Sequence, residues 1–531
     1  MPHVRRDVWK LSATDKTLEW YGRAVEELQK RPITDATSWW SLGAIHGIHP
    51  QIWQNFGFIT ATTPMPPTNV QDILWNQCQH MTWYFLPWHR GYLGAFEQIV
   101  RDAVVKLGGP ADWALPYWNY TDDPNALELP KAFANATLPG GGKNFLHVTR
   151  RYGLAVFPAT QNPILMPSQV AEAASSLQEL FFEGVATGGS AGFGGIKTPF
   201  MHSADDGTFG VLESQPHNGV HVVVGGGFAP NGQVSTNPLQ WGLMTNPDTA
   251  ALDPIFWLHH ANIDRLWSVW LRQKPQPGDP EDAFTNPADT DWLDGPADRK
   301  FTLPRVDGTL FEFTSRQMLD TTAPLLDYIY DDEQTAPVPV ENLAVRFERL
   351  GAPRAAAREL AGAVTMAPAK TAELLGANSG AVRLNSDVVE ARVRLDSGQR
   401  EKLRGSLNVR TLATEATPRT PDRVYLNLEN IKSPSDAALF YVYVNLPEGA
   451  DHEKYKDRFA GTVSMFGVSK ATKSGSGNGV NASFDITSIV DKMHAANTLG
   501  DDISVKLVSA VPGATSDDIS VGRISVYRQG Q

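Results

Sequence analysis

The stretch Asp253-Pro-Ile-Phe-Trp-Leu-His-His-Ala-Asn-Ile-Asp-Arg-Leu-Trp267 predicts a buried helix with two adjacent histidines, and it decides how the rest of the sequence is interpreted. An Asp directly before a Pro is typical of a helix start. Neighbouring residues on a helix point about 100° apart, so one metal ion does not take both His259 and His260. His260 lies on an otherwise apolar stripe at helical spacing, made of Phe256, Ile263, Trp267 and Trp270. On its own, such a histidine is equally well explained as a hydrogen-bonded core residue.

A second pair of histidines lies upstream, in Pro216-His-Asn-Gly-Val-His221. His217 and His221 are at positions i and i+4, about 40° apart on a helix, so both face the same side. This spacing suits a shared metal ion, although two surface histidines can have it by chance. Because the pair lacks a third ligand, it favours His260 as a metal ligand and leaves His259 as a wall of the site.

A third group of histidines precedes both, in Cys78-Gln-His-Met-Thr-Trp-Tyr-Phe-Leu-Pro-Trp-His-Arg90. His80 and His89 are nine residues apart, about two and a half turns, and would lie on opposite faces of one helix. They converge only if the helix breaks between them, and Pro87 predicts that break. The segment Ala44-Ile-His-Gly-Ile-His49 supplies His46 or His49 as a third ligand.

Two sets of three histidines without an obvious carboxylate or thiolate favour copper over a di-zinc or di-manganese hydrolase site, because imidazole is a good copper ligand. The chain has a single cysteine, Cys78, so it forms no intrachain disulfide and no cysteine-rich zinc or iron–sulfur site. The net charge of −12 makes nucleic acid and anionic membranes poor partners. No apolar run is long enough for a membrane span and no signal peptide is evident, so we expect a cytoplasmic location.

These motifs resemble those of the tyrosinase and polyphenol oxidase family, the type 3 dicopper proteins. The matching pieces occur in family order and are Ile45-His46-Gly47, Cys78-Gln-His80, Phe85-Leu-Pro-Trp-His89-Arg with Glu97, Leu115-Pro-Tyr-Trp-Asn119, Pro216 to His221, Asp253 to Arg265, and Tyr328-Ile-Tyr330. The resemblance implies two copper ions with O2 as co-substrate.

The same resemblance implies the role of each residue at the copper pair. The ligands of copper A would be His46, which precedes Gly as in the family, His80 and His89, and those of copper B would be His217, His221 and His260. A thioether between Cys78 and His80 is also implied, with a buried free thiol as the alternative. The supporting or pocket residues would be Phe256, His259, Asp264 and Met244.

Periodicity and resemblance together predict two domains and a linker. Residues 1–335 are expected to form a mainly α catalytic domain, a four-helix bundle around the dicopper core with long loops and with helices over 15–31, 69–80, 88–106 and 168–183. Residues 336–378, rich in Ala and Pro, are expected to form a linker. Runs such as Leu439-Phe-Tyr-Val-Tyr-Val444 alternate with period two and predict an antiparallel β-sandwich over residues 379–531.

The carboxy-terminal part resembles the domain that covers the copper site in the latent form of plant-type enzymes. We therefore expect residues 379–531 to act as a lid. Met465 and Phe466 are the candidates for a side chain that plugs the pocket. The alternative is that this pair belongs to the core of the β domain itself.

For the reaction, the resemblance implies ortho-hydroxylation of monophenols and oxidation of o-diphenols to o-quinones, with small phenols as substrates. Glu213 matches the position of a water-holding Glu in plant members, and Asn218 matches the Asn that orients this water. Both favour a tyrosinase over a catechol oxidase without monophenolase activity, although Glu213 in a purely local pairing is the alternative. A haemocyanin-like O2 carrier would use the same six histidines, but carriers typically form larger assemblies. The oligomeric state stays open, a homo-oligomer included.

Overall fold

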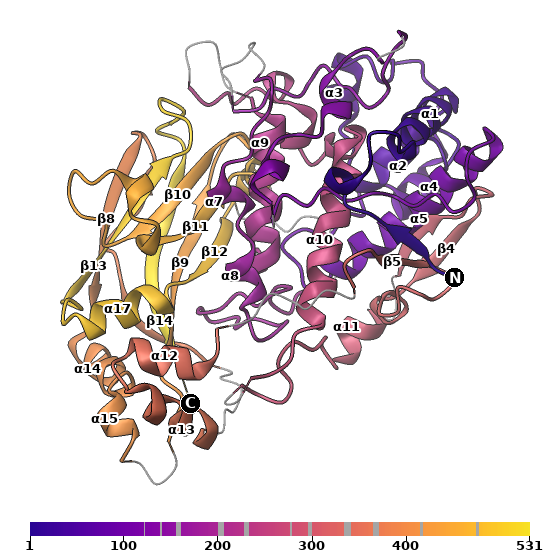
Figure 1. Cartoon of the computed structure of the whole chain (residues 1–531). Coiled ribbons are helices and arrows are strands. Elements are labelled where there is room, and N and C mark those ends of the chain that lie inside the picture. The colour runs from indigo at the N-terminus through magenta and orange to yellow at the C-terminus, as the bar shows by residue number, and fades with distance from the viewer. Residues whose placement is uncertain are drawn as a thin grey trace.

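The computed structural model describes residues 1–121, 123–138, 141–154, 161–199, 206–227, 233–276, 279–295, 300–333, 341–364, 371–414, 418–473 and 477–530. The chain folds into two parts that lie side by side (Figure 1). Helices and loops up to Tyr330 form one part, which we call the helical domain. The strands and short helices between Glu373 and Gln529 form the other, which we call the β domain.

The helical domain is built around two long buried helices. Its principal helices are α1 (Thr17–Lys30), α2 (Trp39–His46), α4 (Thr68–Leu74), α5 (Phe85–Lys106), α9 (Gly219–Gly225) and α10 (Ile255–Leu271). The ring of Phe96 in α5 stacks on that of Trp257 in α10, with centroids 3.4 Å apart. As predicted, α10 begins directly after Asp253-Pro254, where the Asp253 carboxylate accepts a hydrogen bond from the backbone N–H of Ile255.

Two of the expected helices differ from the observed ones. The helix expected over 69–80 ends at Leu74, and Asn76 and Met81 then adopt positive φ angles of 53° and 57°, outside the helical region. The helix expected over 168–183 is two single turns, α7 (Ser168–Ala171) and α8 (Ala174–Leu177). Pro87 does not break a helix either: it lies in the first turn of α5, where its missing N–H would have had no partner.

The β domain is one curled sheet and not the expected sandwich, whereas the pairings among its own strands are antiparallel, as predicted. Its strands are β6 (Glu373–Ala377), β7 (Val382–Arg383), β8 (Val388–Leu395), β9 (Arg423–Lys432), β10 (Leu439–Val444), β11 (Phe459–Ser464), β12 (Gly479–Asp485), β13 (Asp502–Ser509) and β14 (Ser520–Gln529). The path runs β11-β10-β13-β8-β6-β14-β9-β12, and it continues into β2 (Asp206–Thr208) of the helical domain. The sheet is mixed because β2 pairs in parallel with β12.

The segment expected to be a linker carries structure of its own. Within residues 336–378, α12 (Leu343–Arg349) and α13 (Arg354–Ala363) pack on each other around a small apolar cluster, and β6 already belongs to the sheet. Residues 334–340 and 365–370 lie outside the described part of the chain.

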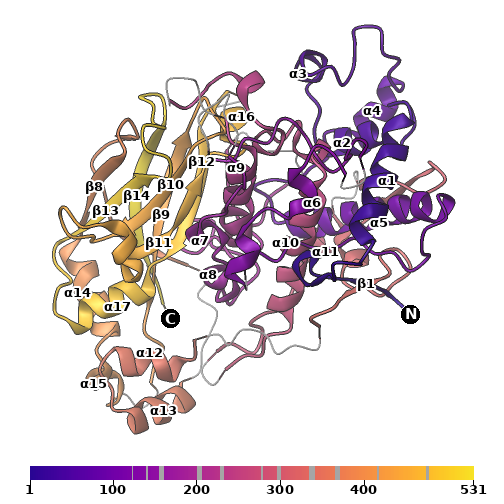
Figure 2. The same ribbon diagram turned by 45° about the horizontal axis from the view of Figure 1, so that its top comes forward.

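The remaining elements tie the ends of the helical domain together. Strand β1 (His3–Arg5) pairs in parallel with β5 (Tyr328–Tyr330), and β3 (Phe301–Pro304) forms a hairpin with β4 (Leu310–Phe313). Figure 2 shows the β domain facing α7, α8 and α9 of the helical domain. Among the described residues, none of the helices combines the length and the apolar composition needed to cross a bilayer.

Candidate metal centre

His217 in η3 (Glu213–Asn218), His221 in α9 and His260 in α10 converge on one point in the core. The Nε2 atoms of His217 and His221 are 3.1 Å apart, and each lies 3.3 Å from Nε2 of His260. All three side chains are at most 1% exposed. Three nitrogen lone pairs this close repel one another unless a cation lies between them. This set therefore fits a metal ion.

A second set of donors lies beside the first. His46 at the end of α2, His80 in the irregular segment before α5, His89 in α5 and Cys78 place their donor atoms within 4.8 Å of one another. The ring of His89 stacks on that of His260, with centroids 4.4 Å apart. The two sets are therefore adjacent, as a dinuclear centre requires.

His46 and not His49 reaches this centre. His49 is exposed and precedes the short helix α3 (Pro50–Asn55), whereas His46 is fully buried. Gly47 lies so close to the next segment that a Cβ there would be 2.8 Å from the carbonyl oxygen of Pro247. Glycine lets that carbonyl approach and accept a hydrogen bond from Nδ1–H of His46, at 2.8 Å.

Backbone carbonyls fix the tautomer of three histidines. The Nδ1–H groups of His46, His89 and His221 donate to the carbonyl oxygens of Pro247, Phe85 and Met244, each at 2.8 Å. Since a carbonyl only accepts, the proton sits on Nδ1 and the Nε2 lone pair stays available for a metal. His46 Nε2 is buried without a hydrogen-bond partner in the described part of the chain. It is an orphaned donor atom that a metal would satisfy.

Burial keeps the imidazoles neutral. It lowers the pKa of His46 to about 4 and that of His217 to about 3. The pKa values of His89, His221 and His260 fall well below the usual range, first through burial and then through neighbouring imidazoles. A neutral imidazole is the form that binds a metal. The donor chemistry thus fits two copper ions, since nitrogen-rich sites of this kind suit copper.

Cys78 touches the histidines of its own set. Its Sγ is 3.5 Å from Nδ1 and 3.4 Å from Nε2 of His80, and 3.5 Å from Nε2 of His89. Burial raises the pKa of this thiol well above its usual value. The near-equal distances to both ring nitrogens of His80 place the sulfur beside the carbon between them or above the ring.

His259, which the sequence predicts to form a wall of the site, lies beside the first donor set. Its Nδ1 is 2.9 Å from the Tyr120 hydroxyl, and its ring lies nearly parallel to that of His217, with centroids 5.2 Å apart. Its donor atom is within 4.8 Å of those of His217, His221 and His260, so distance alone does not exclude it as a ligand. The stripe argument favours His260, whose Nε2 lies 3.3 Å from Nε2 of both His217 and His221. Tyr120 itself was missed, although it directly follows a quoted motif.

The other sequence candidates lie around the two sets. The Phe256 ring packs on His260 at 4.1 Å and on His46 at 4.9 Å. Met244 contributes its carbonyl to His221, not its sulfur. Phe85 was not singled out from the sequence, yet its ring is 4.5 Å from His89 and 4.8 Å from His217. A phenylalanine without polar atoms gives no chemical signal for such a role.

Glu213 and Asn218 lie on either side of His217 in the chain. They begin and end η3 (Glu213–Asn218). The Glu213 carboxylate accepts the backbone N–H of Met81 at 2.9 Å, next to His80, and burial raises its pKa well above the usual range. Asn218 Oδ1 is 2.8 Å from Nδ1 of His217. Both side chains are at most 1% exposed.

Phe466 enters the centre from the β domain. Its ring stacks on His221 with centroids 4.0 Å apart and an angle of 16° between planes, and it meets His80 and His217 edge-on at 5.6 and 5.8 Å. Met465 points the other way and belongs to the apolar core of the β domain. Of the two candidates, only Phe466 reaches the histidines.

Asp264 anchors α10 to the amino terminus and to α5. Its carboxylate accepts hydrogen bonds from Arg90 at 2.5 Å, from Arg5 at 3.3 Å and from the hydroxyls of Tyr328 and Tyr330. Burial alone would raise the pKa of Asp264, but the guanidinium groups of Arg90 and Arg5 outweigh it and hold this pKa below its ordinary value of 3.8. The network acts at a distance from the metal donors and supports the fold.

We expect Asp264→Asn to destabilise the protein by about 3–5 kcal/mol, because Arg90 stays buried without its carboxylate partner while Arg5 keeps its ion pair with Glu97. Urea unfolding followed by fluorescence measures this loss. The folded-state pKa is depressed, so the stabilisation by Asp264 is present above pH 3.8 and disappears as the pH falls through the lower folded-state value. The difference in the free energy of unfolding between the wild type and Asp264→Asn should therefore shrink in acid. A difference that does not change with pH would contradict this account.

Comparisons with known proteins agree with this geometry. The common central domain of tyrosinase matches residues 36–273, and a domain of unknown function, DUF7868, matches residues 371–529. Tyrosinase HcTyr1 of Hahella sp. (strain CCB-MM4) is 31% identical over 99% of both chains. The latent form of the chloroplastic polyphenol oxidase of Prunus armeniaca is 31% identical over 40% of this chain and 32% of its own length.

Solved structures extend the likeness to the whole chain. Recombinantly expressed latent aurone synthase, a polyphenol oxidase, has a TM-score of 0.59 at 21% identity and covers 100% of this chain and 90% of its own. Latent apple tyrosinase has a TM-score of 0.55 at 20% identity, over 99% of this chain and 97% of its own. At these identities the likeness shows the fold, a helical core joined to a carboxy-terminal β domain.

Proposed function

This chain belongs to the tyrosinase and polyphenol oxidase family and is a copper oxidase, and we propose that within this family it is a tyrosinase. It would hydroxylate small monophenols ortho to the hydroxyl group and oxidise o-diphenols to o-quinones with O2. The pair of adjacent buried donor sets, with His89 stacked on His260 between them, supports the copper chemistry. The observation that carries the choice of a tyrosinase is the buried pair Glu213 and Asn218 on the same segment as His217. We propose His46, His80 and His89 as ligands of one copper ion and His217, His221 and His260 as ligands of the other.

The copper pair supplies the redox chemistry with O2, and the protein supplies position and proton transfer. The fixed Nδ1–H bonds of His46, His89 and His221 to carbonyl oxygens hold these rings in place. Apolar rings such as Phe85 and Phe256 keep water away from the donors. Cys78 lies beside His80, and the thioether that the resemblance implies would lock this ring; its formation removes the thiol hydrogen and one ring C–H hydrogen, with the co-substrate O2 as the two-electron oxidant.

The proton of the phenol needs a base. We propose that Glu213 takes it through a water, because burial raises the pKa of this carboxyl and so makes its ionised form a stronger base than an exposed carboxylate. Asn218 accepts the Nδ1–H of His217 and so orients this ring beside the same water. A local pairing role for Glu213 is also satisfied by its bond to Met81 N–H, so the assignment needs a kinetic test.

Asn218→Gly should lower monophenol turnover by roughly tenfold or more relative to diphenol turnover, since a positioned base contributes about 10²–10⁴-fold and the less acidic monophenol depends on it more than the diphenol does. Initial rates of O2 consumption on a monophenol and on its catechol measure the two steps in one preparation. Equal losses on both substrates would assign Asn218 to the fold alone and would favour a catechol oxidase.

The decisive experiment combines copper quantification with O2 consumption on tyramine and on 4-methylcatechol, before and after limited proteolysis. A tyrosinase binds two copper ions per chain and oxidises both substrates. A catechol oxidase oxidises the second alone. An O2 carrier of the haemocyanin kind turns over neither, and zinc in place of copper would overturn the proposal.

We further propose that the β domain is a lid and that the chain is made in a latent form. The support is Phe466, whose aromatic ring lies against three of the proposed ligands, where the ring of a phenol would have to bind. The lid is attached at more than one point: Ser483 Oγ donates to the carbonyl of Gly189 at 2.7 Å, and Lys470 pairs with Asp248 at 3.7 Å. Activation then requires that this interface open.

A further inference from the structure

Strand β11 is an edge strand, and its free edge faces η3, the segment of the helical domain that holds His217. It stands at the end of the sheet path and pairs with β10 on one side. An edge strand presents main-chain groups that need partners. The backbone N–H of Thr462 finds one in the helical domain: it donates to Oε1 of Gln215 at 2.8 Å, and the Thr462 hydroxyl contacts the same oxygen at 3.2 Å.

The other end of the Gln215 amide is fixed within the helical domain. Its Nε2 donates to the carbonyl oxygens of Gln169 and Glu172, each at 3.1 Å, and to the Glu172 carboxylate at 3.2 Å. The carbonyl of Gln215 accepts the Ser176 hydroxyl at 2.6 Å. The side chain is 4% exposed, so it bridges the α7–α8 segment and the lid without solvent between them.

Gln215 also sets the backbone that leads into His217. Its φ of −149° and ψ of 126° are extended, between helical residues on either side, and they create the kink after which Pro216 and His217 follow. On the far side of His217, the Ser464 hydroxyl of β11 donates to the carbonyl of Asn218 at 2.9 Å. The lid strand therefore holds the chain both before and after this histidine.

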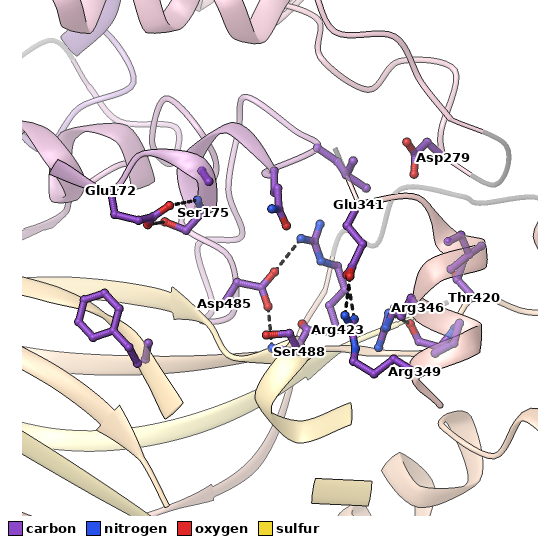
Figure 3. Close-up of a pocket in the computed structure, with 18 of the residues that line it drawn as sticks. Glu172, Ser175, Asp279, Glu341, Arg346, Arg349, Thr420, Arg423, Asp485 and Ser488 are labelled. Carbon is purple, nitrogen blue, oxygen red and sulfur yellow. Dashed lines mark hydrogen bonds and ion pairs between the residues drawn. The ribbon is translucent and has the colours of Figure 1, made fainter. Parts of the chain in front are cut away.

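The bridge lies at the wall of a cavity between the two domains. Glu172 and Ser175 line a cavity of about 380 Å³, with α12 and the β domain on its other sides (Figure 3). Across it, Arg423 pairs with Asp485 at 2.6 Å and Arg349 with Glu341. The Glu172 carboxylate is held by the N–H and hydroxyl of Ser175, at 3.0 and 2.9 Å. This part of the interface therefore contains a hollow lined by charged as well as apolar side chains.

We propose that Gln215 is a positioning residue that couples docking of the lid strand β11 to the placement of His217. The inference rests on the proposed function in one respect, that His217 is a copper ligand. The Gln215 amide bonds both domains at once, through Oε1 to Thr462 and through Nε2 to Gln169 and Glu172. A shift of β11 therefore moves the Gln215 side chain and the backbone that leads into His217. Coupling of this kind is reciprocal: copper at His217 tightens β11, and release of β11 loosens the copper.

The test is hydrogen exchange of the peptide that covers β11, followed by mass spectrometry on the full chain with and without copper. In the wild type, copper should slow exchange of this peptide. Gln215→Leu keeps the volume of the side chain and removes all hydrogen bonds of its amide group. Exchange of the β11 peptide should be roughly tenfold faster in this variant because several buried hydrogen bonds are lost. The effect of copper on β11 should also disappear. Copper competition with a chelator should show weaker retention in the same variant.

The matched control is Ser483→Ala. It removes one hydrogen bond between the same two domains, to Gly189, but does not touch the segment around His217. It should leave the copper effect on β11 intact. Gln215→Glu is the second variant, in case the leucine protein does not fold: it keeps an acceptor for Thr462 but loses the donor to Gln169 and Glu172, and it should also lose the copper effect.

Three results would overturn the proposal: no effect of copper on β11 in the wild type, an unchanged copper effect in a folded Gln215 variant, or an equal loss in Ser483→Ala. None of these readouts depends on phenol turnover. A chain that binds copper and shows the coupling but oxidises no phenol would refute the proposed function and leave the role of Gln215 standing. An active oxidase without the coupling would do the reverse.

Discussion

Phe466→Ala is expected to raise the diphenol oxidase activity of the intact chain by roughly 10- to 100-fold, because a site that is open in a minor population reacts in proportion to that population. The Phe466 ring stacks on His221 at 4.0 Å and occupies the face that a substrate ring needs. Alanine removes the ring and leaves the strand and its hydrogen bonds in place. The lid stays docked, yet the pocket is no longer filled.

The neighbouring residue gives a matched control. Met465 packs in the core of the β domain, so Met465→Leu should leave the activity of the intact chain unchanged. Initial rates on 4-methylcatechol measure both variants, and limited proteolysis of each shows whether the lid remains docked. If Phe466→Ala is no more active than the wild type while proteolysis still activates both, another part of the lid blocks the site. If it is activated only together with faster proteolysis, loss of docking is the cause, not an emptied pocket.

The histidine pattern predicts most of the centre, because each ligand type needs a specific side chain. The i, i+4 spacing of His217 and His221 and the apolar stripe around His260 require only helical geometry, and the structure brings these three together. Backbone carbonyl groups that accept hydrogen bonds from the histidines cannot be recognised in the sequence. The carbonyl oxygens of Pro247 and Phe85 hold two histidines, yet any residue type would supply the same atom.

The errors in the fold have equally local causes. Pro87 was expected to break a helix, but proline is neutral in a first turn, and the break comes from positive φ angles at Asn76 and Met81. The sheet is mixed because β2, the short strand Asp206-Gly-Thr208, pairs in parallel with β12; the sequence does not predict this strand, since Asp and Gly are depleted in strands. Which of Met465 and Phe466 faces the histidines depends on how the β domain docks. The local sequence around these two residues does not predict a contact between the two domains.

The other large effect concerns the choice between His46 and His49, which the sequence pattern alone leaves open. The two histidines are three residues apart, but His46 is fully buried beside His80 and His89, whereas His49 is exposed at the start of α3. His46→Ala should therefore lower copper from two ions to one per chain and reduce diphenol oxidation by at least ~100-fold, since even residues that merely support a ligand cost about 10–100-fold. His49→Ala should change neither.

Copper per chain after gel filtration and O2 consumption after proteolytic activation measure both consequences, and activation removes the lid as a variable. Nδ1–H of His46 donates to the Pro247 carbonyl, and this bond is lost in the variant, so circular dichroism must show that the fold survives. His46→Gln keeps a polar side chain at the site without an imidazole and should fail in the same way. A fully loaded, active His46→Ala protein, or loss of copper in His49→Ala, would require a different third ligand. Either result would contradict the geometry, because Nε2 of His46 is buried and has no hydrogen-bond partner in the described part of the chain.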